Sequence, residues 1–513
     1  MVTSKISKRV IVSLITIYLS FSLVSCGQAQ NASPCAGSGV VVDSAFFVPV
    51  DTSYSFINYD ANHLIFCGDS SQMQRFAKKL YRVLRTGKGN VSVVQIGASH
   101  VQGGTFPHQM RRNLLLGARK AVQTPDCDIQ SFPVASRGML FPYSAAVKCN
   151  NPFDYKVSRS WPLVLTRNVY KEPDQQLGLC GIAVTAVDSA AEVGITLCEP
   201  ELDFSTRTIV LLGQSTGGVV PQLKVSTGSG EPVLLMPTDI DSLRRRYTYH
   251  NEWPVDSFRI LLPCDSGQAF ALTGVYLENH QPGITYHSIG VNGASTSDYL
   301  NKCPYLTTDL RLCRPDLVIF GIGINDASGP NFDTAVFRQR YLQLVDSIRS
   351  VSPDCAFIFI TNNDSYRYAK RRYTVNNNGP LVRDAFMRIA AACGGMVWDQ
   401  FTIMGGLTSM SKWNEAQLAQ RDKVHFTRRG YQLLGDMMHN AIFEAVTALK
   451  PTPPPVSNER RKDVKPTSDS TASPQRPASD DNNSKKYLYK NRKQRKSDSQ
   501  YGDNDERSNY VFE

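Results

Sequence analysis

Apolar and polar positions along this chain follow a helical period in some stretches and a strand-like pattern in others. Over residues 71–84, apolar side chains recur every three or four positions, which predicts an amphipathic helix. Residues 91–96 form an apolar run typical of a buried strand, and the run ends at Gly97. We therefore expect Ser99 just beyond the carboxyl end of a strand.

The same alternation returns in the second half of the chain. Apolar runs predict strands at residues 316–323, 355–360 and 395–399. Helical periodicity predicts helices at residues 335–348, 379–393 and 429–448. Strands that alternate with helices form mostly parallel sheets, so we expect one α/β domain made of residues 70–125 and 287–450. Such sheets bind their ligands at the carboxyl ends of the strands.

Residues 126–286 have a different pattern. Short β-rich runs are separated by Gly, Ser, Pro and Asp, and long helical periodicity is missing. This pattern predicts a β-sandwich-like module inserted into the α/β domain. Its aromatic residues have two interpretations, exposed glycan-binding side chains or core, and the candidates are Trp161, Tyr247, Tyr249 and Trp253.

The N-terminus resembles an export signal. A basic start is followed by an apolar stretch over residues 10–23, too short for a membrane span. It ends in Leu-Val-Ser-Cys-Gly at residues 23–27, which resembles the lipobox of bacterial lipoproteins. We expect residues 1–26 to be a signal peptide, with Cys26 lipidated and the protein lipid-anchored outside the cytoplasm, at the periplasmic face or the outer membrane. The alternative is an ordinary secretory signal with a chance cysteine. Residues 27–69 are expected to form a tether.

The C-terminal residues 451–513 begin with a proline-rich run and continue with polar and charged residues. Such a composition buries too little apolar surface to fold, so we expect a disordered tail. The formal net charge is +11, and the most basic run, at residues 485–496, lies in this tail. Because many acids accompany it, we interpret the charge as a solvated tail and expect no nucleic-acid partner.

The chain has 12 cysteines. Export makes disulfides possible, and spacing offers two candidate pairs, Cys180 with Cys198 and Cys303 with Cys313, although connectivity does not follow from sequence. No cysteine or histidine cluster has the spacing of zinc ligands, so we expect neither a metal nor another cofactor.

Four short segments, far apart in the chain, carry the candidate chemistry. They are Gly-Ala-Ser-His at 97–100, Gly-Val-Asn-Gly at 290–293, Gly-Ile-Asn-Asp at 323–326 and Asp-Lys-Val-His at 422–425. Together they supply a serine, oxyanion-type donors, and a histidine with a nearby carboxylate. This is the inventory that acyl transfer from an oxygen ester needs.

Each group has an expected role. Ser99 is the candidate nucleophile, and its backbone N–H is a candidate oxyanion donor. His425 is the candidate base, and Asp422, three residues earlier, would hold the imidazole tautomer that leaves Nε2 free to accept the serine proton. Gly293 and Asn325 are further oxyanion donors.

Taken alone, each candidate residue also has a non-catalytic interpretation. Ser99 and the Gly-X-Asn-Asp segment are typical of turns, and His425 fits a surface histidine near an acid. His100 competes as the base, but in an extended segment it would point away from Ser99. Gly290 is an alternative to Gly293 as a donor.

The four segments resemble the blocks of the SGNH (GDSL-type) hydrolase superfamily, which contribute Ser, Gly, Asn and His in this order. The resemblance covers residues 70–125 and 285–448. The sequences at 398–407 and 424–431 are similar to those of exported peptidoglycan O-acetylesterase-like members, which also have a β-rich insertion between the first two blocks. The resemblance implies a flavodoxin-like three-layer α/β/α fold. One departure is Ala98, which stands where the family usually has aspartate.

Three functions fit these observations. The first is an esterase that removes O-acetyl groups from a cell-envelope or other polysaccharide, so that the expected partner is an O-acetylated glycan. The second is an O-acetyltransferase with the same triad, which a neighbouring gene for a membrane-bound acyltransferase would favour. The third is a non-catalytic glycan-binding lipoprotein, to which Ala98 gives some weight and the complete set of catalytic residue types gives little.

Overall fold

The structure is a computed structural model, and it describes residues 46–122, 136–145, 154–160, 163–171, 176–187, 191–199, 201–226, 231–369 and 371–449. The predicted signal peptide, Cys26, Trp161 and the predicted tail at 451–513 lie outside these ranges. Among the helices of the described ranges, none is both long and apolar enough to cross a membrane.

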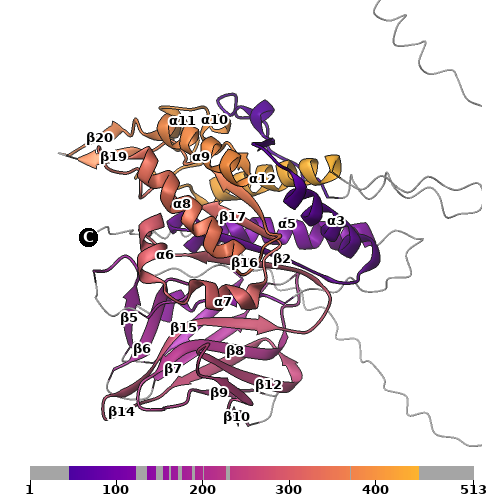
Figure 1. Cartoon of the computed structure of the whole chain (residues 1–513), viewed down its shortest axis with the longest axis vertical. Coiled ribbons are helices and arrows are strands. Elements are labelled where there is room, and N and C mark those ends of the chain that lie inside the picture. The colour runs from indigo at the N-terminus through magenta and orange to yellow at the C-terminus, as the bar shows by residue number, and fades with distance from the viewer. Residues whose placement is uncertain are drawn as a thin grey trace, which may run out of the picture. The chain divides into compact units, whose positions relative to one another are not determined.

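A six-stranded sheet forms the centre of the α/β domain (Figure 1). The strand order is β1-β21-β18-β17-β2-β16, and all neighbours are parallel except β1, which runs antiparallel to β21. If β1 is set aside, the strands follow the flavodoxin order 2-1-3-4-5. The bounds are β1 Leu64–Phe66, β2 Asn90–Gly97, β16 Gly283–Gly290, β17 Leu317–Gly321, β18 Ala356–Ile360 and β21 Met396–Trp398.

Helices cover both faces of this sheet. On one face α3 Ser71–Thr86, α5 Thr105–Val122 and α12 Arg428–Ala448 pack together. On the other face α8 Thr334–Arg349 contacts α6 Thr296–Lys302, α7 Leu306–Cys313 and α9 Gly379–Cys393. The short helices are η1 Tyr59–Ala61, α4 Ser99–Gln102, η2 Tyr143–Ala145, α10 Gln400–Ile403 and α11 Ser409–Glu415. The predicted three-layer fold is confirmed.

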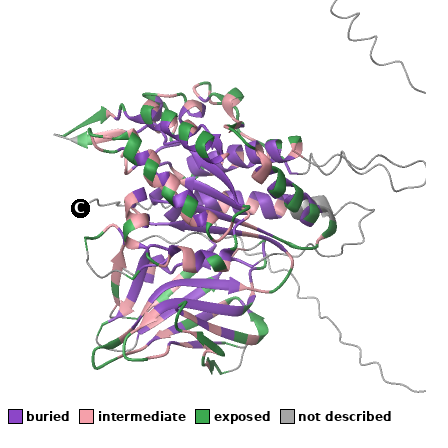
Figure 2. Cartoon of the chain, viewed as in Figure 1, coloured by how far each residue is buried: buried purple, intermediate pink, exposed green. Residues whose placement is uncertain are grey.

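The strands of the central sheet are almost entirely buried, as Figure 2 shows. In β18, all five residues are buried, which fits a parallel strand covered by helices on both faces. The amphipathic pattern of α3 agrees with the sequence, since its apolar positions Met73, Phe76, Leu80 and Leu84 are buried. Periodicity was therefore a sound guide to these elements.

The inserted module consists of two antiparallel sheets, which contact each other through β13 and β15. The five-stranded sheet contains β4 Tyr155–Arg159, β7 Ala191–Leu197, β9 Gln222–Val225, β10 Val233–Leu235 and β13 Ser257–Leu262. The eight-stranded sheet contains β3 Gly138–Leu140, β5 Leu163–Arg167, β6 Ile182–Ala186, β8 Thr206–Ser215, β11 Asp239–Asp241, β12 Arg246–Val255, β14 Cys264–Asp265 and β15 Gln268–Glu278. A β-rich insertion was the expectation for this region.

A buried charge cluster links the insertion to the hydrolase-like domain. Asp154, before β4, accepts hydrogen bonds from Arg111 of α5 at 2.9 Å and from Arg137. All three side chains are at most 1% exposed. Burial alone would raise the pKa of Asp154, but Arg137 and Arg111 outweigh it and hold that pKa well below its usual range. The carboxylate is therefore ionised and paired.

The domain borders differ from those expected. Strand β1 joins the central sheet and Phe46 stacks on Phe443 at 4.9 Å, so residues 46–69 belong to the folded domain rather than to a tether. Strand β16 pairs with β2 from Gly283 onward, so the insertion ends before residue 286. Short apolar segments such as these are positioned by contacts with residues far away in sequence, and sequence periodicity does not reveal such contacts.

One further expectation needs correction, and one open alternative is decided. Cys180, Cys303 and Cys313 are free thiols, so neither candidate disulfide pair forms. In the insertion, Tyr247 and Tyr249 are buried and belong to the core, whereas Trp253 is 38% exposed. Strand β12 has one face in the sheet's core, and alternation places both tyrosines on that face.

Candidate active site

Ser99 begins α4 directly after β2, at the point where the sheet order reverses between β2 and β17. Ala98 forms the bend with φ −115° and ψ −133°. The hydroxyl of Tyr299 donates a hydrogen bond to the Gly97 carbonyl at 3.0 Å and thereby supports the bend. This is the crevice in which open α/β sheets bind ligands.

Three residues predicted to act together form a hydrogen-bonded chain. His425 Nε2 lies 2.8 Å from Ser99 Oγ, and His425 Nδ1 lies 2.7 Å from Asp422 Oδ2. Ser99 and His425 are buried, and the Asp422 side chain is 30% exposed. With the proton on Nδ1, where the carboxylate accepts it, Nε2 is the free acceptor for the serine proton.

The loop before His425 is shaped around the carboxylate of Asp422. Its Oδ1 accepts hydrogen bonds from the backbone N–H groups of Val424 at 2.9 Å and His425 at 3.0 Å. Lys423 turns the chain with a left-handed φ of +57°, which is uncommon for a residue with a side chain. Burial alone would raise the pKa of Asp422, but the hydrogen bond and charge of His425 and these N–H groups lower it below the ordinary value.

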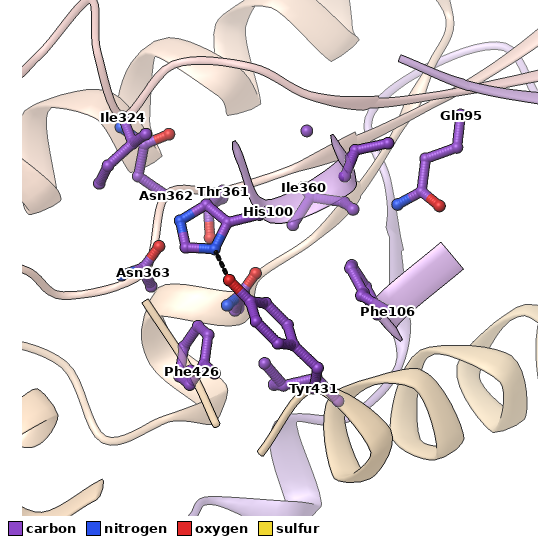
Figure 3. Close-up of a pocket in the computed structure, with 14 residues that line it drawn as sticks. Gln95, His100, Phe106, Ile324, Ile360, Thr361, Asn362, Asn363, Phe426 and Tyr431 are labelled. Atoms are coloured by element: carbon purple, nitrogen blue, oxygen red, sulfur yellow. Dashed lines mark hydrogen bonds between the residues drawn. The ribbon is translucent and has the colours of Figure 1, made fainter. Parts of the chain in front are cut away.

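His100 does not take part in this chain. The segment is helical and not extended, and successive helical side chains point about 100° apart. His100 Nδ1 is hydrogen-bonded with the Tyr431 hydroxyl at 2.7 Å (Figure 3). The ring centroid of His100 lies 5.1 Å from that of His425. Burial first, and then the charge of His425, lower the pKa of His100 to about 3, so it stays neutral and is a poor base.

The candidate oxyanion donors come from two adjacent loops. Asn325 donates one amide N–H to the Ala294 carbonyl at 2.9 Å, which places its amide beside the Gly293 turn and leaves its second N–H. Gly293 adopts φ +83°, and among the described residues no group accepts a hydrogen bond from its N–H. Gly290, the alternative, ends β16, and its N–H lies 3.4 Å from the Tyr143 hydroxyl. Gly293 is therefore the better candidate.

The two oxyanion loops are tied together by Asp326. Its carboxylate accepts the Thr296 hydroxyl at 2.6 Å and the Thr296 backbone N–H at 3.2 Å. Burial raises the pKa of Asp326 despite these bonds. The aspartate of the Gly-Ile-Asn-Asp segment thus positions neighbouring backbone and does not face the serine.

Sequence reasoning missed two positioning residues. Gln102 of α4 accepts a hydrogen bond from the Asn292 backbone N–H at 2.7 Å and so fixes the Gly293 turn to the helix of Ser99. Asn363, after β18, donates to the Val424 carbonyl at 3.0 Å and fixes the loop of His425. The only available signal was the position of Asn363 after a strand, while nothing local distinguished Gln102.

A small cavity of about 30 Å³ lies beside His100, the residue that follows Ser99 (Figure 3). Polar side chains line part of it, among them Gln95, His100, Asn362 and Asn363. His100 Nε2 and Gln95 Nε2 have no hydrogen-bond partner among the described residues. Because a water occupies about 10–15 Å³ by this measure, the space suits two or three waters and is too small for a sugar.

Among the described residues, no group of three or more His, Cys, Asp or Glu side chains is arranged to hold a metal ion. The groups assembled at Ser99 are instead a nucleophile, a base with its orienting acid, and neutral N–H donors. These are the parts of acyl transfer to a serine.

Comparison with known proteins places this geometry in a family. Residues 265–433 match the GDSL-like lipase/acylhydrolase family. The domain is an SGNH, or GDSL-type, hydrolase domain. The chain is accordingly an ester-hydrolysing enzyme. Ser99 precedes the matched residues, and only the pairing of β2 with β16 and β17 brings it to the site.

A solved peptidoglycan O-acetylesterase has the same fold, with a TM-score of 0.57 and 23% identity over 75% of this chain and 99% of that chain. A GDSL-like lipase from Bacteroides thetaiotaomicron VPI-5482 matches with a TM-score of 0.24 and 17% identity over 30% of this chain and 74% of that chain. A family two carbohydrate esterase from Cellvibrio japonicus matches with a TM-score of 0.23 and 9% identity, over 58% of this chain and 100% of that chain. No curated protein sequence matches significantly.

Ala98, which stands where the family usually has aspartate, lies in a turn that other residues support. Ala98 is fully buried, and its carbonyl packs against Gly290, where an added Cβ would lie 2.6 Å from the oxygen. The bond from Tyr299 and the bond accepted by Gln102 hold the two ends of this turn. The turn therefore has its supports without a carboxylate.

Proposed function

We propose that this SGNH hydrolase is a serine esterase that removes O-acetyl groups from a cell-envelope or other polysaccharide. The observation that carries the proposal is the hydrogen-bonded chain from Ser99 through His425 to Asp422. The resemblance to peptidoglycan O-acetylesterase-like proteins, in sequence blocks and in fold, favours an acetylated glycan as the substrate.

The geometry supports a two-step reaction. Ser99 Oγ attacks the acetyl carbonyl carbon while His425 Nε2 takes the hydroxyl proton, and the carbonyl oxygen becomes an oxyanion. The N–H groups of Ser99, Gly293 and Asn325 are the donors proposed to stabilise it. The C–O bond to the sugar breaks, His425 returns the proton to the sugar oxygen, and an acetyl-serine remains. Water then attacks this ester by the same route and releases acetate.

The compartment is a second part of the proposal. The lipobox-like segment at residues 23–27 supports lipidation of Cys26 and anchoring on the extracytoplasmic side of a membrane. An enzyme held there would meet cell-envelope glycans. Labelling of the protein by a radioactive fatty acid in bacterial cells, lost in Cys26→Ala, is the result expected; equal labelling of the variant would contradict it.

Acetate release tests the catalytic proposal. The purified protein should release acetate from a chromogenic acetyl ester and from O-acetylated peptidoglycan, and Ser99→Ala should abolish both activities. Ser350→Ala, an exposed serine at the end of α8, is the matched control and should behave as the wild type. If the wild type released acetate from neither substrate, hydrolysis would be refuted; acetylation of an added glycan by the same ester would instead support transfer.

A further inference from the structure

A β-hairpin lies directly against the loop of His425. It consists of β19 Tyr366–Ala369 and β20 Arg372–Val375, and it projects from the SGNH domain (Figure 1). The backbone N–H of Tyr366 donates to the carbonyl of Lys423 at 3.0 Å. Lys423 directly follows Asp422. The first residue of the hairpin is therefore hydrogen-bonded to the residue next to Asp422.

The base of the hairpin is fixed to the loop of Asn325 as well. Asn376 donates to the Ala327 carbonyl at 3.1 Å, and Asn378 donates to the carbonyls of Ala327 and Gly329 at 2.9 and 2.8 Å. Arg367 donates to the Gly329 carbonyl at 2.9 Å. The hairpin is thus held to two of the catalytic loops, which gives its side chains a defined position relative to Ser99.

One face of the hairpin carries exposed aromatic rings. Tyr368 pairs with Tyr373 across the strands, with ring centroids 4.9 Å apart, and the two residues are 65% and 41% exposed. Because side chains alternate along a strand, Tyr366 lies on the same face. Lys423 Nζ lies 4.8 Å from the Tyr366 ring and 5.7 Å from the Tyr373 ring. The aromatic face therefore extends to the triad loop.

The surroundings of this face are cationic. Arg371 and Arg372, at the tip, are exposed and form no salt bridge within the described residues, and alternation from Tyr373 places Arg372 on the opposite face of the hairpin. Arg421 and Lys423 flank Asp422 in the triad loop, and the carboxylate of Asp422 faces His425. In the hairpin and in the loop of Asp422, positive charges outnumber negative charges. The resulting positive electrostatic potential attracts anions over about 8–10 Å in ordinary salt.

We propose that this hairpin face is a substrate-binding platform for an acidic O-acetylated glycan. The rings of Tyr368 and Tyr373 stack on the apolar C–H faces of sugar rings next to the acetylated one. The guanidinium group of Arg371, in the turn at the tip, pairs with a carboxylate carried by the same glycan. The proposal rests on the proposed esterase function, because it concerns the substrate of the same site.

The test compares three substrates: O-acetylated peptidoglycan, which carries carboxylates, acetylated xylan freed of acidic side groups, and a chromogenic acetyl ester. Tyr368→Ala/Tyr373→Ala should lower kcat/KM on peptidoglycan about tenfold more than on the small ester, because only the polymer extends from Ser99 to the two rings. Tyr368→Ala alone, at the more exposed position, should show a smaller difference of the same kind between the kcat/KM losses on peptidoglycan and on the small ester. Arg371→Ala should lower kcat/KM on peptidoglycan but not on xylan, and should weaken the dependence of kcat/KM on salt.

Phe66→Ala is the matched control. Phe66 is 40% exposed, and its pairing with Met396 at the start of β21 places it at the amino ends of the parallel strands, opposite Ser99. Phe66→Ala should change kcat/KM on the polymer and on the small ester by the same factor. All variants should keep the wild-type melting temperature within a few degrees.

If the double tyrosine variant lost kcat/KM equally on all three substrates, the platform would be overturned and the rings would have a structural role. An arginine variant that lost the same activity on xylan as on peptidoglycan would overturn the preference for an acidic glycan. If wild-type activity depended on Ser99 and the tyrosine variants had unaltered activity, the platform alone would be refuted. If the wild type were inactive on every ester, the esterase proposal itself would be refuted.

Discussion

Replacing Asp422 by asparagine separates the two tasks of this carboxylate. Oδ1 accepts two backbone N–H groups, from Val424 and His425, whereas Oδ2 faces His425 Nδ1. In Asp422→Asn the amide oxygen can keep the two backbone bonds, which places the NH₂ group against Nδ1. The imidazole must then accept at Nδ1 and carry its proton on Nε2, where it cannot take the proton of Ser99.

Rotation of the asparagine would restore the active tautomer but at a cost. It would turn the NH₂ group toward two backbone N–H donors, so that two hydrogen bonds worth about 1 kcal/mol each are lost and two partly buried donors are left unpaired at about 1–3 kcal/mol each. A penalty of roughly 4 kcal/mol or more keeps the inactive tautomer dominant, since 1.4 kcal/mol corresponds to about tenfold. We expect kcat to fall roughly 10³–10⁴-fold, in line with other triads.

The assay is hydrolysis of a chromogenic acetyl ester at pH 8, together with thermal unfolding. Asp422→Ala is the matched comparison, because it removes both oxygens and should lower both activity and melting temperature. Asp422→Asn should lose activity while keeping the melting temperature near that of the wild type. The reasoning fails if Asp422→Asn keeps activity within about tenfold of the wild type, or if it is destabilised as much as Asp422→Ala.

Three further predictions concern stability. Gly290→Ala would place a Cβ 2.6 Å from the backbone oxygen of Ala98, so we expect a loss of about 1–3 kcal/mol with reduced esterase activity; an unchanged melting temperature would contradict the packing. Asp154→Asn should cost about 3–5 kcal/mol in denaturant unfolding, because two buried arginines lose their counter-charge, and a loss below 1 kcal/mol would argue against the cluster. Burial raises the pKa of Asp309 from 3.8 to about 6 although Arg245 lies 4.0 Å away. The folded state therefore holds this proton more tightly than the unfolded state, and wild-type stability should fall by on the order of 3 kcal/mol relative to Asp309→Asn between pH 4 and 6, with no further divergence above. Parallel pH profiles of the two proteins would refute this.

Local pattern was enough to predict the elements that build the site. The apolar run before Gly97 and the helical spacing over residues 71–84 report burial on faces fixed by the backbone period, so β2 and α3 could be read directly. The link between Asp422 and His425 is also local, because three residues in a tight turn allow contact.

Other features depended on distant partners. Ser99 and His425 are 326 residues apart, and nothing near either residue indicates that their side chains meet at 2.8 Å. The helix at Ser99, which turns His100 away, is a short segment stabilised by packing against β16 rather than by its own sequence.

What the sequence by itself determined was the set of strands and helices, the chemical inventory and its order along the chain. What only the tertiary structure decided was how these parts meet: the role of Gln102 in holding the Gly293 turn, the incorporation of β1 into the sheet, the free thiols, and the aromatic hairpin beside Lys423. The physical reason is range. Periodicity records which face of one element is buried, whereas these contacts join elements that are far apart in sequence and are fixed only when the whole sheet assembles.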